Sequence, residues 1–113
     1  MSEKIPKFNL LDMVGCIEQI QLYIKGYDYQ KFIDDSRTVD AVIRNLEVMG
    51  EAANRLPTEF TSLYSTVPWD LIIATRNRVI HGYDSVDHKI VWEIIINQLP
   101  GLKQSLTDII GKI

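Results

Sequence analysis

The sequence contains few of the residues that build disulfides and metal sites. It has one cysteine, Cys16, and two histidines, His81 and His88. A single cysteine cannot form an intramolecular disulfide, which fits a reducing compartment, and its apolar neighbours indicate a buried thiol. The histidines have no cysteine partner and no His-x-x-x-His spacing. We therefore expect neither a metal site nor a cofactor.

Long apolar runs are also missing. None approaches the roughly 20 residues that span a bilayer, and the N-terminal stretch lacks the compact apolar segment of a signal peptide. We therefore expect a cytoplasmic protein that does not contact membranes. The sequence has no glycine-rich phosphate loop and no serine-centred nucleophile turn, so these common nucleotide-binding and hydrolase motifs do not describe it.

What is present is ordinary globular composition, with 46% apolar and 24% charged residues. At 113 residues the chain is sized for a single domain, residues 1–113. Its net charge of −3 argues against an obligate nucleic-acid coat protein, which would usually be basic. A local basic site remains compatible with this charge.

Apolar residues recur at intervals of three and four, which predicts helices throughout and requires no β-strand. Pro100 should bend or break the last helix near Asn97, because proline lacks the N–H donor. The expected fold is all-α, an up-and-down bundle of about four major helices. The expected helical ranges are Pro6 or Asn9 to Ile24, Tyr29–Ile33, Thr38–Leu56, a short element in 58–64, Pro68–His81 and 89–113.

Several residues predict how these helices begin, end or approach one another. Asp35 or Ser36 can cap the helix of residues 38–56, and Ser85 can cap the last one. Gly82 suits the position just after the helix of residues 68–81. Gly50 inside a helix costs about 1 kcal/mol relative to alanine. It therefore predicts a close helix approach.

The segment "RNRVIHGY" contains an unexpected residue, Arg76. In a helix, Ile72, Ile73, Val79 and Ile80 share one face, and Arg76 falls in the middle of it. A buried arginine needs a partner, so Arg76 either pairs with an internal carboxylate or faces a cleft. The structural ion pair is the simpler interpretation.

His81 adds a chemical interpretation of the same segment. A guanidinium clamps phosphate and stabilises charge in the transition state, and an imidazole moves protons near neutral pH. Together, Arg76 and His81 could cleave a phosphodiester bond without a metal.

A polar row is expected on the helix of residues 38–56. Its members recur at helical spacing and are Arg44, Glu47, Glu51 and Asn54. A solvated, ion-paired face is the simpler interpretation. The alternative is that one carboxylate orients an active-site arginine.

The segment of residues 76–83, together with its flanks, resembles a known protein family. "RNRVIHGY" matches the Arg-x4-His-x-Tyr motif of the HEPN superfamily and resembles its HepT-like branch. The flanking "AVIRNLEVMGEAANRLP" and "VPWDLIIATRNRVIHGYDSVDHKIVWEIIINQLPGLK" are similar to that branch as well. The likeness covers nearly the whole chain and is weakest over residues 1–35.

The resemblance implies a toxin of a two-gene toxin–antitoxin module, acting as a metal-independent ribonuclease on RNA. It implies a homodimer with the motif at a cleft between protomers, and an MNT-type nucleotidyltransferase antitoxin as partner. Arg76 and His81 match the catalytic pair, Asn77 matches the motif's polar second position, and Arg78 adds positive charge nearby. Tyr83 matches the tyrosine that the antitoxin modifies with AMP.

Two rival interpretations remain open at this stage. The chain could be a non-catalytic subunit that holds a nucleotide or substrate for a nucleotidyltransferase, because fold does not fix function. It could also be a helical dimerisation domain with a structural arginine–carboxylate pair. Loss of RNA cleavage on changing His81 would separate the ribonuclease from both.

Overall fold

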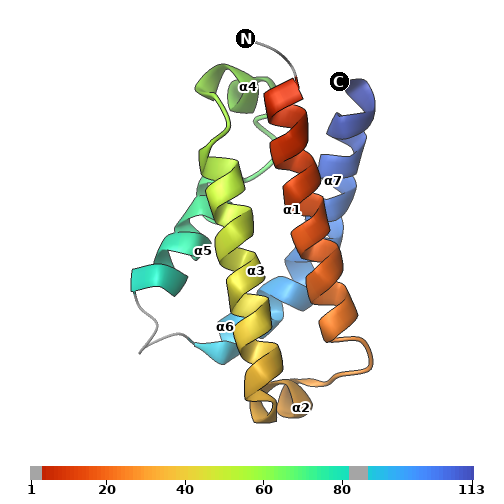
Figure 1. The fold of residues 1–113 in the computed structure, drawn as a ribbon, viewed down its shortest axis with the longest axis vertical. Helices are drawn as coiled ribbons and strands as arrows, with labels where there is room; N and C mark the ends of the chain where they lie inside the picture. The colour runs from red at the N-terminus through yellow and green to blue at the C-terminus, as the bar shows by residue number, and fades with distance from the viewer. Residues whose placement is uncertain (1–3, 82–86) are drawn as a thin grey trace.

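The computed structural model describes the backbone of residues 4–81 and 87–113, and the side chains of residues 6–75 and 87–113. Every regular element in this part of the chain is helical (Figure 1). The elements are α1 (Lys4–Tyr23), α2 (Tyr29–Asp34), α3 (Ser36–Asn54), α4 (Thr58–Leu63), α5 (Trp69–His81), α6 (His88–Glu93), the π-helical η2 (Ile94–Gln98) and α7 (Leu99–Lys112).

Helix α1 forms where the sequence predicts it and begins slightly earlier. Its apolar stripe is buried, and Cys16 is buried with it, as predicted. Gly26, with φ of 78°, allows the chain to turn after the helix, a conformation that other residues seldom adopt. The buried residues of the stripe are Leu10, Met13, Cys16, Ile17, Ile20 and Ile24.

A hydrogen-bonded cluster joins the turn between α1 and α2 to the start of α3. Asp35 is the N-cap of α3, one of the two predicted caps, and accepts a hydrogen bond from the Thr38 backbone N–H at 3.2 Å. Its second carboxylate oxygen accepts from Tyr27 Oη at 2.6 Å and from Thr38 Oγ1 at 2.7 Å. These bonds lower the pKa of Asp35, with the Tyr27 hydroxyl as the largest cause.

Helices α4 and α5 are joined through an aromatic cluster. Phe60 packs against Tyr64 and Trp69, and the Trp69 indole N–H donates to the Tyr64 carbonyl at 3.1 Å. Pro68 immediately precedes α5, one residue outside the predicted boundary, and its carbonyl accepts from the Ile72 N–H at 3.1 Å. The cluster thereby fixes where α5 begins.

The predicted break near Asn97 is a π-helical turn. Leu99 N–H donates to the Ile94 carbonyl, five residues back, instead of the residue four back. Pro100 follows in the first turn of α7, where its missing donor costs little. The chain therefore changes direction through a widened turn while remaining helical.

Figure 1 shows the four longer helices alternating in direction, so the predicted all-α, up-and-down bundle is confirmed. Helix α3 lies between α1 and α5 and makes its most extensive contacts with these two, and α7 packs along α1. No helix in the described ranges is both long and apolar enough to cross a membrane.

Candidate functional site

Helix α5 places four of the five predicted site residues. Arg76, Asn77, Arg78 and His81 lie in its C-terminal half, and their backbone is helical. Their side chains are outside the described part of the structure. Tyr83 lies outside the described residues altogether, as do the predicted capping positions Gly82 and Ser85. The mutual geometry of the motif side chains therefore stays a prediction.

The described half of α5 shows which way the helix is turned. Ile72 is buried and Ile73 packs against the core, so the first half of the predicted apolar face is confirmed. Thr75 is half-buried and donates its hydroxyl hydrogen to the Leu71 carbonyl at 2.9 Å. Leu71 itself is 51% exposed. Arg76 follows directly after this turn.

An apolar groove of about 370 Å³ lies where α3, α5, η2 and α7 meet. Leu46 and Met49 line it from α3, and Ile72 and Thr75 from α5. The remaining lining residues come from the start of α5, from η2 and from α7: Pro68, Leu71, Ile94, Gln98, Leu99, Gly101, Leu102 and Ser105. Because Thr75 is one of its lining residues, the groove extends to the position immediately before Arg76, where the motif begins.

The polar row on α3 divides into two environments. Arg44 and Asn54 are exposed, as a solvated face would be, whereas Glu47 and Glu51 are half-buried. Glu51 is not without an interaction partner. Nearby, Asn45 donates from its amide to the Ala41 carbonyl at 2.9 Å within the same helix. The exposure of Arg44 and Asn54 agrees with the simpler interpretation, a solvated face, while the roles of Glu47 and Glu51 stay open.

The described side chains include no group of three or more histidine, cysteine or carboxylate residues that could hold a metal ion. Clear pKa shifts within this part of the chain fall on Asp35 and Cys16, neither of which is on α5. Burial raises the pKa of the Cys16 thiol, and the nearby Asp12 charge raises it further. An all-α bundle, with Arg76 and His81 of the Arg-x4-His-x-Tyr sequence motif on the last turns of α5, defines the class, a small helical protein of the HEPN type.

Comparison with protein families agrees with this class and narrows it. A family model described as "Ribonuclease HepT-like" matches residues 13–109, from α1 through α7. The chain belongs to this HepT-like ribonuclease family.

Individual relatives carry names of the same kind. "Putative RNase TTE0752" of Caldanaerobacter subterraneus subsp. tengcongensis is 37% identical over 79% of this chain and 80% of its own length. "Putative RNase MJ0127" of Methanocaldococcus jannaschii is 34% identical over 100% of this chain and 93% of its own. "Probable ribonuclease HepT" of Thermococcus cleftensis is 34% identical over 83% of this chain and 86% of its own length. No solved structure matches the chain significantly.

Two features of this region were not predicted from the sequence. The groove is assembled from four elements, so no single periodic pattern signals it. The half-burial of Glu47 and Glu51 is a tertiary effect as well, because both appear in the sequence as ordinary members of a polar row. Gly50, which the sequence predicted to mark a close helix approach, is buried on α3, and the approach itself stays a prediction.

Proposed function

We propose that this chain is the toxin of a HEPN/MNT-type toxin–antitoxin module in the cytoplasm, and that it cleaves RNA as a metal-independent endonuclease. One observation carries the proposal. Arg76 and His81 of the Arg-x4-His-x-Tyr motif fall on the last turns of α5, in a chain that belongs to a ribonuclease family.

The proposed reaction uses the 2′-hydroxyl of RNA as the nucleophile. The 2′-oxygen forms a bond to phosphorus while the bond to the 5′-oxygen breaks, leaving a 2′,3′-cyclic phosphate. His81 takes up the proton from the nucleophile or supplies one to the leaving oxygen, and solvent balances the other transfer. Arg76 stabilises the charge that develops on the phosphoryl oxygens. Asn77 and Arg78 support phosphate binding.

A homodimer is part of the proposal. The apolar groove and the half-exposed Leu71 adjoin the turn that precedes Arg76. A second copy packed on this side would cover apolar surface and bring two motifs together. Two copies of Arg76 and Arg78 would concentrate positive charge locally on an acidic chain, which favours RNA binding.

The ribonuclease assignment is tested with purified protein, a mixed RNA substrate and a metal chelator. Cleavage should persist in chelator and yield cyclic phosphate ends. Arg76→Ala and His81→Ala should each lower the rate by about 100-fold or more. His88→Ala is the matched control, because it removes the chain's other histidine, which is exposed at the start of α6. Unchanged cleavage by His81→Ala would exclude the proposed role of His81.

Silencing by AMP on Tyr83 is the second half of the proposal. The tyrosine oxygen would attack the α-phosphate of ATP and release pyrophosphate, in a reaction catalysed by the MNT-type antitoxin. The attached phosphodiester would occupy the arginine that RNA phosphate needs, and the nucleoside would block entry sterically.

The test for silencing is incubation with the proposed MNT-type nucleotidyltransferase partner, ATP and Mg²⁺, followed by peptide mass spectrometry. AMP is expected on Tyr83, with loss of cleavage. Tyr83→Phe should escape silencing while remaining active. If Tyr83→Phe is silenced as fully as the natural chain, the antitoxin acts by binding alone or at another residue. A chain that binds the transferase but never cleaves RNA would be the non-catalytic subunit.

A further inference from the structure

Helix α1, which packs against α3 and α7 (Figure 1), also exposes apolar side chains to solvent. Half of the eight large apolar residues that are exposed in the described part of the chain lie on this helix: Phe8, Leu11, Leu22 and Tyr23. The exposed residues of α3, in contrast, are all polar or charged: Ser36, Arg37, Asp40, Arg44 and Asn54. The outward face of α1 therefore differs from the ordinary solvated face of an amphipathic helix.

Three of these apolar side chains form one stripe that is centred on Gly15. At about 100° per residue, Phe8, Leu11 and Leu22 all lie within roughly 40° of Gly15 around the helix axis. Ile17, which is fully buried, lies roughly 160° from Gly15. The stripe is therefore on the side of α1 that is opposite the core. We call these four residues, Phe8, Leu11, Gly15 and Leu22, the outer stripe.

The packing of a single copy does not account for the glycine at the centre of the outer stripe. A Cβ added at Gly15 would meet no neighbouring heavy atom within 4 Å. Its φ is not positive, unlike that of Gly26, so the backbone conformation does not require glycine either. Glycine inside a helix lowers stability relative to alanine. A close approach of another helix would explain it, because the distance between helix axes depends on the side chains at the contact.

The outer stripe is complementary to itself in an antiparallel pair of helices. Phe8 precedes Gly15 by seven residues and Leu22 follows it by seven, so both are about 10.5 Å from Gly15 along the axis. A two-fold axis beside Gly15 therefore places Phe8 of each copy level with Leu22 of the other. Leu11 of one copy is level with the space between Gly15 and Leu22 of the other, where a knob can enter a hole.

The charges beside the outer stripe are compatible with this pairing. Asp12 and Glu18 lie three residues before and after Gly15, on opposite flanks of the stripe. In the antiparallel pair, Asp12 of one copy is level with Glu18 of the other but on the opposite flank. Both are exposed to solvent, which screens their repulsion, and Lys103 lies 3.4 Å from Glu18. The antiparallel direction also opposes the two helix dipoles.

We propose that the outer stripe binds a second copy of this chain, with the two α1 helices antiparallel and crossing at Gly15. None of its residues lines the groove, so this contact uses a different surface from the proposed dimer and does not depend on the ribonuclease assignment. One pair of helices, each about 30 Å long, buries less area than a standard interface. The contact is therefore weak and joins copies at high local concentration.

The first test is analytical ultracentrifugation of Leu71→Asp, a change that disfavours the proposed groove dimer. A monomer–dimer equilibrium with a Kd on the order of 100 μM is expected. Leu22→Glu in this background should weaken it by about tenfold or more, because the carboxylate would be buried against Phe8 of the second copy. Leu63→Glu is the matched control, since Leu63 is an exposed leucine on α4, and it should leave the equilibrium unchanged.

Two results of this test would overturn the proposal. One is a Leu71→Asp chain that stays monomeric at about 1 mM, which would leave the outer stripe to a different partner. The other is an equal effect of Leu22→Glu and Leu63→Glu. Circular dichroism of each variant shows that it is folded, and Phe8→Glu replaces Leu22→Glu if the latter is not.

Gly15→Leu separates a specific pair from general stickiness of an apolar surface. The variant should have at least the Tm of the natural chain, because the new side chain meets nothing within one copy and leucine favours helix. It should nevertheless weaken association by about tenfold or more, because the helices can no longer approach closely at the crossing. General stickiness predicts tighter association instead, since leucine adds apolar area. Tighter or unchanged association would overturn the proposal.

Cross-linking tests the antiparallel direction. Phe8→Cys and Leu22→Cys each add a thiol at an exposed position, while the natural Cys16 is buried. In the proposed pair, positions 8 and 22 of different copies are level, whereas the two copies of position 8 are about 21 Å apart along the axis. A short bismaleimide should therefore couple a mixture of the two variants several-fold more efficiently than either variant alone. Peptide mapping that finds position 8 linked to position 8 as efficiently as to position 22 would overturn the proposal.

Discussion

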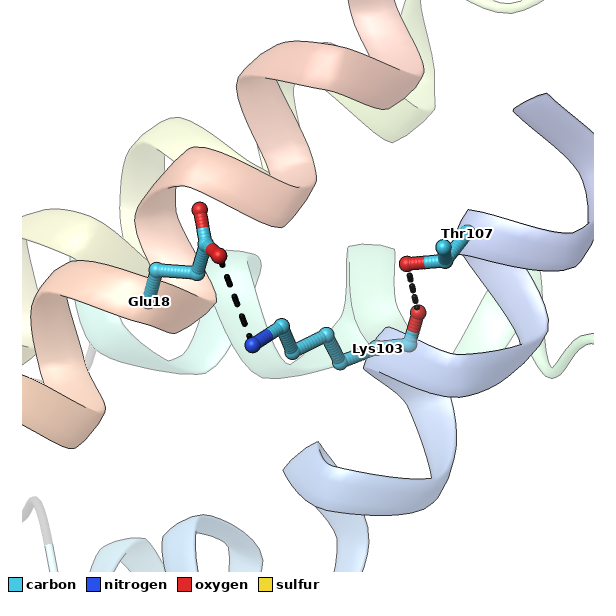
Figure 2. A network of polar contacts seen from close by, with 3 residues as sticks. All are labelled: Glu18, Lys103 and Thr107. Carbon is cyan, nitrogen blue, oxygen red and sulfur yellow. Dashed lines mark hydrogen bonds and ion pairs between the residues drawn. The ribbon is translucent and has the colours of Figure 1, made fainter. Parts of the chain in front are cut away.

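The side of the bundle formed by α1 and α7 differs from the side formed by α3 and α5. Between α1 and α7 the buried stripes meet, and Lys103 Nζ lies 3.4 Å from Glu18 Oε2 at the edge (Figure 2). Helices α3 and α5 also pack closely, but where they meet η2 and α7 the surface is hollowed into an apolar groove, with the half-exposed Leu71 among its lining residues. The difference indicates that the contact between α1 and α7 serves stability, while the groove leaves surface available for binding.

We call the side formed by α1 and α7 the closed side. Truncating a buried side chain there should have the largest effect on folding. Leu106 on α7 is 0% exposed and belongs to the main core cluster. Leu106→Ala should lower the free energy of unfolding by about 2–5 kcal/mol through lost burial and a residual cavity. Urea unfolding followed by circular dichroism measures this, with Leu63→Ala as the control because Leu63 is 76% exposed. A loss below that of the control would mean that the closed side is not the stabilising one.

We call the surface around the apolar groove the open side. Placing a charge there should affect association of two copies instead of folding. Leu71→Asp lies on the rim of the groove at a half-exposed position. It should weaken the proposed dimer by about tenfold or more, because a carboxylate would be buried against apolar groups. Light scattering at micromolar concentration measures the change. A natural chain that is monomeric under these conditions would refute the dimer and the shared cleft.

The polar cluster at the start of α3 predicts a pH effect of smaller size. The folded-state pKa of Asp35 is lowered, first by the Tyr27 hydroxyl and then by Thr38. Its contribution to stability is therefore complete above the usual aspartate pKa of about 3.9 and is lost as the pH falls through the lowered value. Tyr27→Phe should destabilise the protein at pH 7 and progressively less in acid. Thermal unfolding at several pH values tests this, and a penalty independent of pH would contradict it.

Removing the edge ion pair on the closed side should have the smallest effect. Lys103 is 34% and Glu18 59% exposed, so solvent screens their attraction. Glu18→Gln should change the free energy of unfolding by about 0–1 kcal/mol, and less at high salt. The Thr107 hydroxyl bond to the Lys103 carbonyl, 2.8 Å, is independent of this charge (Figure 2). A larger loss would show that the pair, and not the apolar stripe, closes this side.

The sequence predicted most of the fold because the long helices are strongly periodic. The buried stripe of α3 is the clearest case: Val42, Leu46 and Met49 recur at intervals of four and three residues and are all buried. The widened turn of η2 could not be predicted beyond a break near Asn97, since its hydrogen-bond pattern depends on how α6 and α7 pack.

The candidate site, like the fold, could be predicted from the sequence only in part. Arg76 and His81 were predicted as site residues from residue type, spacing and family resemblance. Their backbone lies in α5, within the predicted helix, and their role stays a prediction. The groove and the half-burial of Glu51 arise from contacts between helices distant in sequence. Local spacing contains no record of such contacts, so these features required the three-dimensional arrangement.

The burial of the single cysteine offers a natural gauge of local opening. Cys16 sits on the core face of α1 with a raised pKa, so both access and ionisation slow its alkylation. A thiol reagent should therefore react only in molecules whose α1 has transiently detached. The alkylation rate would report the population of that open state without an added label. Comparing this rate with and without the proposed antitoxin partner would show whether its binding also tightens the bundle far from the motif.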